Sequence, residues 1–313
     1  MTDLILHHYD FSNYSEKVRV VLGLKGLAWH SVETPATLPK PDYLPLTAGY
    51  RRAPALQVGA DVYCDTVRII EELERRFPEP SLYPGAAPEA QRAFIAGLER
   101  WADVILTRHS INYAACTYVD APRFTTQFLD DRAELLGKPE PGRERRRAAA
   151  PKNLEQLRPM LAWIEDIFRD GRRYACGDAM SLADCVLYHP LWIMDQLAGE
   201  RVPVLSERLR DWMDHIAERG HGSPEPMKAP EALAVAVAAE PLPALPSEVL
   251  ENDPALGEMV SITPNDYGRL NPAVGTLLSI DAHRLAIQHR NDRVGLVTTH
   301  FPRVGYRVRR GSV

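Results

Sequence analysis

Hydroxyl side chains cluster where an apolar strand meets a helix near the start of the chain. Ser12, Tyr14 and Ser15 lie within residues 4–25, LILHHYDFSNYSEKVRVVLGLK. This pattern predicts a strand over residues 4–6 and a helix that begins near Tyr14 or Ser15. The first N–H groups of a helix lack intrahelical acceptors, and the helix dipole adds partial positive charge there. A hydroxyl or thiol at this point would have its anion stabilised, although plain N-capping by Ser12 and Ser15 fits the same pattern.

A second polar pair stands at another junction between a strand and a helix. Asp65 and Thr66 follow a predicted hairpin over residues 55–64 and precede an amphipathic helix over residues 67–77. Free N–H groups and the Thr66 hydroxyl can bind a carboxylate there, and Asp65 can pair with an ammonium group. A simple N-cap is the alternative, and both roles can hold together.

The elements that position these residues predict a small α/β domain over residues 1–80. A second strand is expected over residues 29–32, and a proline-bearing loop over residues 34–49 is too irregular for a long helix. The order strand, helix, strand, loop, hairpin, helix is typical of a thioredoxin-like arrangement.

The middle of the chain, residues 88–220, predicts an all-α helical domain behind a proline-rich connector. Apolar residues recur at helical spacing in residues 91–118 and 153–168. Ser181 and Asp184 form a variant of the capping box, with a structural role at the start of a helix.

The last third of the chain changes character. Residues 221–257 predict a proline-rich connector with one short helix, and residues 258–313 predict five short strands in a small antiparallel β module. We expect a barrel or a curled sheet. So short a segment makes a marginal core, so we expect the module to pack on the helical domain or on a second subunit.

Composition excludes several classes of function. The net charge of −5 gives no reason to expect nucleic acid or an anionic membrane as a partner. No apolar run is long enough to span a bilayer, and the N-terminus has no signal-peptide pattern. The four cysteines form no CxxC pair and no metal-ligand spacing, which predicts a cytoplasmic protein with reduced thiols and without a metal site.

Four segments in order resemble the cytosolic glutathione S-transferases. The segment SNYSEKVR is similar to the S-P-F-S-x-K-V-R motif of the serine-type classes. RRAPAL resembles the family's x-I-P-x-L segment, CDTVRII its E-S-x-x-I segment, and SLADCVLY its capping box in the helical domain. The resemblance implies a thioredoxin-like glutathione-binding domain followed by an all-α domain; the β module is not typical of the family.

The resemblance also implies roles for individual residues. Ser12 would donate its hydroxyl proton to the sulfur of glutathione, with Tyr9, Tyr14 and Ser15 as alternates. Asn13 departs from the motif, because the family has proline there.

The remaining glutathione contacts follow from the other motifs. Pro54 would be cis, and the backbone of Ala53 would then pair with the tripeptide. Arg52 would bind the glycyl carboxylate, with Arg51 as a competitor for that role. Asp65 and Thr66 would hold the γ-glutamyl end.

The helical domain of the family supplies the pocket for the electrophile and dimer contacts. Tyr113 and Tyr118 are therefore candidates for that pocket, and a homodimer is expected. We expect a detoxification-type transferase that stabilises the glutathione thiolate for attack on a small apolar electrophile. The alternatives are a glutathione-dependent isomerase, dehalogenase or lyase, or a non-catalytic glutathione- or ligand-binding protein whose β module mediates interactions.

Overall fold

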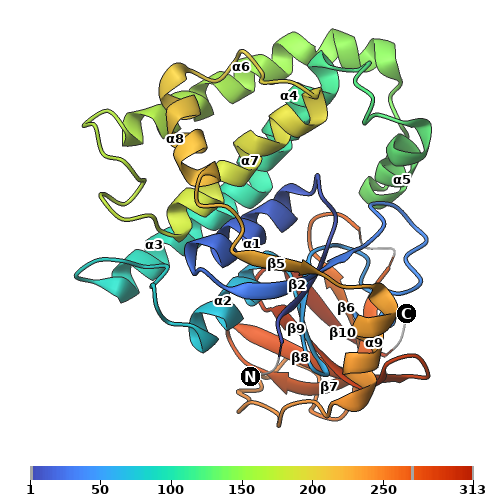
Figure 1. Cartoon of the computed structure of the whole chain (residues 1–313). Helices are drawn as coiled ribbons and strands as arrows, with labels where there is room; N and C mark the ends of the chain where they lie inside the picture. Colours follow the sequence, from blue (N-terminus) through green and yellow to red (C-terminus); the bar gives the residue numbers. More distant parts are fainter. Residues whose placement is uncertain (1–2, 269–270, 312–313) are drawn as a thin grey trace.

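The computed structural model describes residues 3–268 and 271–311, and its first part has the expected α/β order (Figure 1). Ser12 caps the first helix, which begins at Asn13, one residue before the expected start. The elements are β1 (Ile5–His8), α1 (Asn13–Leu24), β2 (Ala28–Glu33), β3 (Ala55–Val58), β4 (Asp61–Cys64) and α2 (Thr66–Arg76). β1 pairs in parallel with β2 and antiparallel with β3, and β3 pairs antiparallel with β4. This is the thioredoxin-like arrangement that the sequence predicts.

The two faces of this sheet bury different partners because successive side chains of a strand point to opposite sides. Leu6 and Leu56 join the core under α1 and α2, which includes Val18, Val21 and Ile69. Ile5 and Val32 face the other way and contact Ala232.

The helical domain follows, with a hydrophobic core continuous with the α1 side of the sheet. Its elements are α3 (Pro88–Trp101), the π-helical η1 (Ala102–Leu106), α4 (Thr107–Thr117), α5 (Thr126–Leu136), α6 (Arg143–Ile167), α7 (Leu182–Ala198) and α8 (Glu207–Ala217). The expected capping box is present at the start of α7, where Asp184 Oδ2 accepts a hydrogen bond from the Ser181 N–H at 2.9 Å.

The connector does more than join two domains. It forms β5 (Ser223–Pro226), which pairs in parallel with β2, and α9 (Ala229–Ala238). The buried Gln57 side chain donates a hydrogen bond from Nε2 to the Ala232 carbonyl at 2.8 Å and accepts one at Oε1 from His7. α9 therefore covers the face of the sheet that α1 and α2 leave open.

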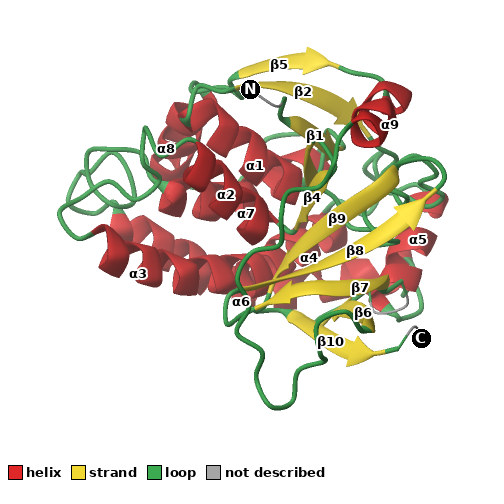
Figure 2. Cartoon of the chain, turned by 90° about the horizontal axis from the view of Figure 1, so that it is seen from below, coloured by secondary structure: helices red, strands yellow, loops and turns green. Residues whose placement is uncertain are grey.

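The β module does not form a barrel, and it is not separate from the first domain. Its strands are β6 (Met259–Pro264), β7 (Ala273–Ile280), β8 (Arg284–Asn291), β9 (Gly295–Pro302) and β10 (Tyr306–Arg310). They form an antiparallel sheet whose β9 pairs in parallel with β4. Within the described residues, ten strands thus form one sheet in the order β10-β6-β7-β8-β9-β4-β3-β1-β2-β5 (Figure 2). The module thus packs mainly on the first domain, which the sequence does not predict, and it contacts the helical domain through the Gly268 N–H, which donates to the Leu135 carbonyl.

A shared core explains how so short a module is stabilised. Buried residues of the first domain, among them Tyr43, Leu46 and Val62, pack in one cluster with Leu277 and Phe301 of the module. Burying apolar area contributes about 25 cal/mol per Å², and the module gains it from the first domain rather than from itself alone.

Truncating Phe301 should therefore destabilise the whole α/β part of the chain. Phe301 is fully buried, and we expect Phe301→Ala to lower the free energy of unfolding by about 3–5 kcal/mol in urea denaturation. Val304→Ala is the control, because Val304 is 68% exposed, and its change should stay within about 0.5 kcal/mol. Equal effects of the two substitutions would contradict a shared core.

Candidate functional site

Ser12 lies at the N-terminus of α1 with its hydroxyl proton uncommitted. Its Oγ accepts a hydrogen bond from the Ser15 N–H at 3.1 Å, and its carbonyl accepts the N–H of Glu16. The side chain is buried, and within the described residues its proton reaches no protein acceptor. The hydroxyl can therefore donate to a ligand atom held at the helix entrance, where the helix dipole favours negative charge.

The three alternate residues differ in how their side chains are engaged. The Tyr14 hydroxyl already donates to the Asp103 carbonyl at 2.8 Å, and burial raises the pKa of Tyr14 well above its usual value. Ser15 is fully buried, with its Oγ unpartnered. The Tyr9 ring makes an edge contact with Phe11, with ring centroids 5.0 Å apart, and Lys40 lies 5.6 Å from its centroid. Ser12 therefore stays the predicted donor to sulfur, with Tyr9 and Ser15 as alternates.

Asn13 secures the loop in the position where the family motif has proline. Its Nδ2 lies 3.0 Å from His189 Nδ1, and His189 Nε2 lies 3.0 Å from Asp103 Oδ1. Although burial acts to raise it, the Lys17 ammonium lowers the pKa of Asp103 to about 2, so this carboxylate must accept. Burial lowers the pKa of His189 to about 4, so the neutral ring donates from Nε2 and accepts from Asn13 at Nδ1.

The buried ammonium group of Lys17, in α1, contacts residues of α3, η1 and α2. Lys17 Nζ lies 2.7 Å from Glu99 Oε1, 2.9 Å from Asp103 Oδ2 and 2.9 Å from Thr66 Oγ1. Burial alone would lower the pKa of Lys17, but the two carboxylates raise that pKa above the ordinary range. Burial raises the pKa of Glu99 to about 7. Thr66 Oγ1 accepts from Lys17, and no described residue accepts the Thr66 hydroxyl proton, so that proton is available to a ligand.

Around the junction of β4 and α2, the backbone is as expected, but the Asp65 side chain already has partners within the protein. The Ala53–Pro54 peptide bond is cis, as expected, and Ala53 precedes β3 without joining its ladder. Asp65 caps α2, with Oδ1 accepting from the Val67 N–H at 3.0 Å and Oδ2 accepting from the Tyr306 hydroxyl at 2.8 Å. Burial raises the pKa of Asp65.

The two candidate arginines face different acceptors. Arg51 is buried, and its Nη2 lies 2.5 Å from Asp131 Oδ1 in α5, so this residue fixes the loop before β3 against the helical domain. Arg52 Nη2 lies 2.7 Å from Asp266 Oδ1 in the module and also donates to the Tyr267 carbonyl.

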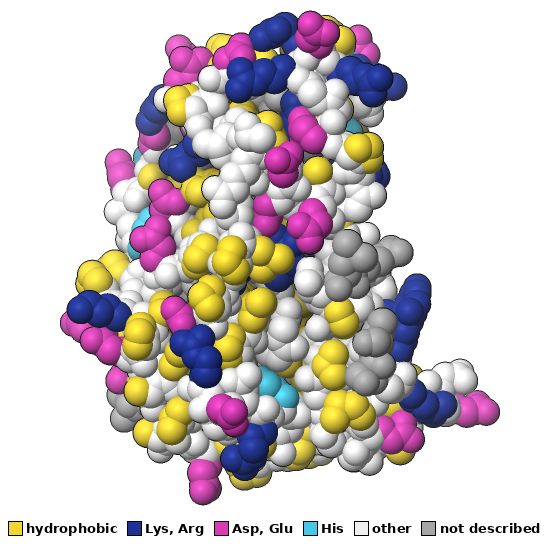
Figure 3. Space-filling view, turned by 90° about the vertical axis from the view of Figure 1, so that its right-hand side faces the viewer, with side chains coloured by type: hydrophobic (Ala, Val, Ile, Leu, Met, Phe, Trp, Pro, Cys, Tyr) yellow, Lys and Arg dark blue, Asp and Glu magenta, His cyan; other side chains and the backbone are white. Residues whose placement is uncertain are grey.

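The expected electrophile residues lie in the helical core, and other aromatic residues line the loop. Tyr113 is buried, and its ring centroid lies 6.3 Å from that of Tyr118. Phe11, by contrast, makes an edge contact with Phe128 of α5, with centroids 5.7 Å apart. On the face that carries α5, hydrophobic side chains gather below the charged surface of the helical domain (Figure 3).

Sequence reasoning also missed Lys40 in the proline-bearing loop. Its ammonium nitrogen lies 5.6 Å and 5.3 Å from the ring centroids of Tyr9 and Tyr43. Burial, together with nearby Arg132 and Arg51, lowers the pKa of Lys40 to about 7. A lysine in a polar loop is ordinarily solvated, so nothing in the sequence marks this one as buried.

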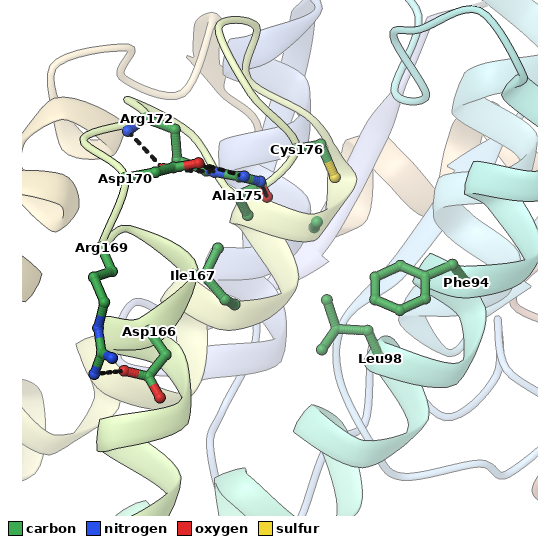
Figure 4. Close-up of a pocket in the computed structure, with 10 residues that line it drawn as sticks. Phe94, Leu98, Asp166, Ile167, Arg169, Asp170, Arg172, Ala175 and Cys176 are labelled. Atoms are coloured by element: carbon green, nitrogen blue, oxygen red, sulfur yellow. Dashed lines mark hydrogen bonds and ion pairs between the residues drawn. The ribbon is translucent and has the colours of Figure 1, made fainter.

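A separate groove of about 520 Å³ lies between α3 and the loop after α6 (Figure 4). Its floor is apolar, with Phe94 and Leu98 facing Ile167, and ion pairs such as Asp170–Arg172 stand at its rim. Of the four family motifs only SLADCVLY reaches the groove, through Ala183, and none of the predicted glutathione contacts lines it.

Elsewhere, the described residues contain no cluster of three or more His, Cys, Asp or Glu that could hold a metal ion. No described helix is both long and apolar enough to cross a bilayer.

Comparisons with known proteins agree with this geometry. The family profiles "Glutathione S-transferase, N-terminal domain" and "Glutathione S-transferase, C-terminal domain" match residues 6–81 and 144–215. A crystal structure of a GST-like protein from Pseudomonas syringae is 32% identical, with a TM-score of 0.71, over 99% of this chain and 100% of that chain. The β module is therefore included in the match.

Relatives of lower identity match about two thirds of the chain. A Stringent starvation protein A homolog of Pasteurella multocida is 27% identical over 66% of this chain and 82% of its own length. A glutathione S-transferase from Rhodospirillum rubrum, 23% identical, shares the fold with a TM-score of 0.53 over 70% of this chain and 90% of that one.

Removing the buried ammonium should destabilise the junction of the domains. We expect Lys17→Met to lower the free energy of unfolding by about 3–5 kcal/mol, because Asp103 and Glu99 would be left buried without their cation. Denaturant titration measures the change, and Lys152→Met, at an exposed position of α6, is the control. A loss no larger than that of the control would show that the network contributes nothing to stability.

Lys40 should make stability rise with pH. Its lowered pKa means that the unfolded chain binds more protons than the folded chain between pH about 7 and the ordinary lysine pKa of about 10.4. The free energy of unfolding of the native chain should therefore increase, relative to that of Lys40→Met, as the pH rises from 7 to 10. A difference between the two proteins that is independent of pH would contradict this interpretation.

Proposed function

Because the chain belongs to the glutathione S-transferase family, we propose that it binds glutathione at the N-terminus of α1 and activates its thiol. The observation that carries this proposal is the buried Ser12 hydroxyl, which accepts the Ser15 N–H and keeps its own proton free. Donation of that proton to sulfur stabilises the thiolate and lowers the thiol pKa from about 8.5 toward neutrality. Ser12 itself need not ionise.

The other contacts would orient the tripeptide. The Thr66 hydroxyl and the free N–H groups at the start of α2 would bind the γ-glutamyl carboxylate, and Asp65 would pair with the ammonium group. Ala53, beside the cis Pro54, would pair with the backbone of glutathione. Arg52 would bind the glycyl carboxylate; Arg51 is a weaker candidate because Asp131 already engages it.

The reaction would be attack of the thiolate on a small apolar electrophile. The sulfur forms a bond to carbon while the leaving group departs with its electron pair, and the thiol proton goes to solvent before the attack. Phe11 and Phe128 add apolar surface beside the loop, so we propose them together with Tyr113 and Tyr118 as the electrophile side of the pocket. Excluding water there strengthens the hydrogen bond from Ser12 to the sulfur.

We also propose a cytoplasmic homodimer. The cysteines of the described residues are free thiols, which suits a reducing compartment. Exposed aromatic residues on the helical domain, Phe94 and Trp163, are 69% and 58% exposed and offer apolar surface to a second subunit.

A second candidate is a protein that holds a ligand without turnover. The observation that favours it is the engagement of Arg52 and Asp65 by the module. The chain is also similar to a Stringent starvation protein A homolog, a relative whose name specifies no transferase activity. Retention on immobilised glutathione without turnover of any electrophile in a broad panel, isomerisation and dehalogenation substrates included, would favour this candidate.

The serine mechanism predicts the effect of removing one hydroxyl. Hydrogen bonds to charged groups contribute about 1.5–3 kcal/mol, so Ser12→Ala should raise the pKa of the bound thiol by about 1–2 units. Ultraviolet absorbance of the thiolate against pH measures this pKa, and conjugation at pH 7 should fall about 10- to 100-fold. Ser15→Ala and Tyr9→Phe serve as matched controls. An unchanged thiol pKa in Ser12→Ala, with a shift in either control, would assign the role to that residue instead.

A further inference from the structure

The β module places a carboxylate on the arginine that faces the candidate site. Asp266 Oδ1 and Oδ2 lie 2.7 Å and 3.4 Å from Arg52 Nη2 and Nη1, so the carboxylate meets the guanidinium with both oxygens. The Tyr267 ring also stacks on the same group, with its centroid 3.8 Å from Cζ, and the Tyr267 carbonyl accepts from Nη2. A carboxylate on a guanidinium is the contact proposed above for the glycyl end of glutathione.

The module also places a proton donor on the carboxylate at the other end of the site. The Tyr306 hydroxyl of β10 donates to Asp65 Oδ2 at 2.8 Å, and the Tyr50 hydroxyl lies 2.6 Å from that of Tyr306. Tyr50 and Tyr306 are both buried, so this hydroxyl pair is part of the packed core between the first domain and the module. Asp65 is the group proposed above to receive the γ-glutamyl ammonium, which is likewise a donor.

The segment 266–268 is closely fitted into this position. Gly268 has φ +72°, and a Cβ built on it would lie 2.9 Å from Leu135 Cδ1 and 3.2 Å from Arg52 Nε. Its N–H donates to the Leu135 carbonyl of α5 at 2.8 Å. The segment therefore spans from the first domain to the helical domain, across the side of the site on which Arg52 lies.

We propose that the β module is a built-in competitor of the thiol ligand. Asp266 stands in for the glycyl carboxylate on Arg52, and the Tyr306 hydroxyl stands in for the ammonium group on Asp65. The module must release these two residues before glutathione can make both contacts. This inference rests on the proposed function, because it assigns both positions from the way glutathione would bind.

The charges of Arg52 and Asp65 explain why the state in which the module contacts both residues is stable without a ligand. Arg52 is largely buried and would lack a counter-ion without Asp266 or a ligand carboxylate. Among the described residues, no cation pairs with Asp65 at contact distance, and the neutral Tyr306 hydroxyl satisfies it without an added charge. A ligand with one carboxylate and one ammonium group at these ends would replace the Asp266 carboxylate on Arg52 with its own carboxylate and the neutral Tyr306 hydroxyl on Asp65 with a cation.

The test compares glutathione binding by the full chain in four forms. These are the native chain, Asp266→Ala, Tyr306→Phe and the double variant, and Asp292→Ala is the control because Asp292 is an exposed acidic residue of the module. Only the binding-competent fraction of a chain takes up ligand, so releasing the competitor lowers the apparent Kd. Calorimetry should show glutathione bound at least 10-fold more tightly by the double variant, with no change in the control. If the native chain binds glutathione and the double variant binds it equally or more weakly, the inference is overturned.

A second measurement separates this inference from the proposed function. Phenylglyoxal modifies accessible arginines, and mass spectrometry reports the rate at Arg52 in the absence of any ligand. Arg52 should be protected in the native chain and in Asp292→Ala, and labelled at least 10-fold faster in the double variant. If Arg52 is labelled equally fast in the native chain and the double variant, the inference is overturned. If the labelling rates differ as expected but no form binds glutathione, the closed site stands and the proposed ligand is wrong.

Discussion

The structure depends on one buried ammonium group. Lys17 extends from α1 toward α3 and η1, and its contacts with Glu99, Asp103 and Thr66 join the first helix, the helical domain and the start of α2. Because burying a charge is costly unless it is paired, the fold is stabilised when these segments meet at this point. Asp103 is hydrogen-bonded to His189, and His189 is hydrogen-bonded to Asn13, which is next to Ser12. The position of the candidate donor is thus a consequence of how the two domains pack.

Local chemistry made the junctions predictable. Ser12 before an amphipathic run and Asp65 before another have the side chains that cap helices, and both do so in the structure. The strands of the module alternate in polarity between turn residues, and their positions agree with the sequence to within a few residues. Asp184 could be assigned to a capping box because both partners lie three residues apart.

Contacts between distant segments could not be predicted in the same way. Lys17 sits in an amphipathic helix, where a lysine ordinarily marks the solvated face. The ion pair of Arg52 joins residues 214 positions apart. β5 contains two prolines, which do not predict a strand, and the pairing of β9 with β4 depends on a surface that only the folded first domain provides. Hydrophobic periodicity predicts single helices and strands, whereas these features are contacts between elements that are far apart in the sequence.

Lengthening the sheet changes what its borders present to other molecules. β4 would otherwise expose a row of unpaired N–H and C=O groups, which is a template for association with foreign chains. Its place at the border is taken by β10, whose sequence YRVRR carries three arginines, and the opposite border is β5, whose sequence SPEP carries two prolines and an acidic residue. Positive charge at one end and missing amide donors at the other both hinder the addition of a further strand. The enlarged sheet therefore ends in two segments that protect the protein against aggregation.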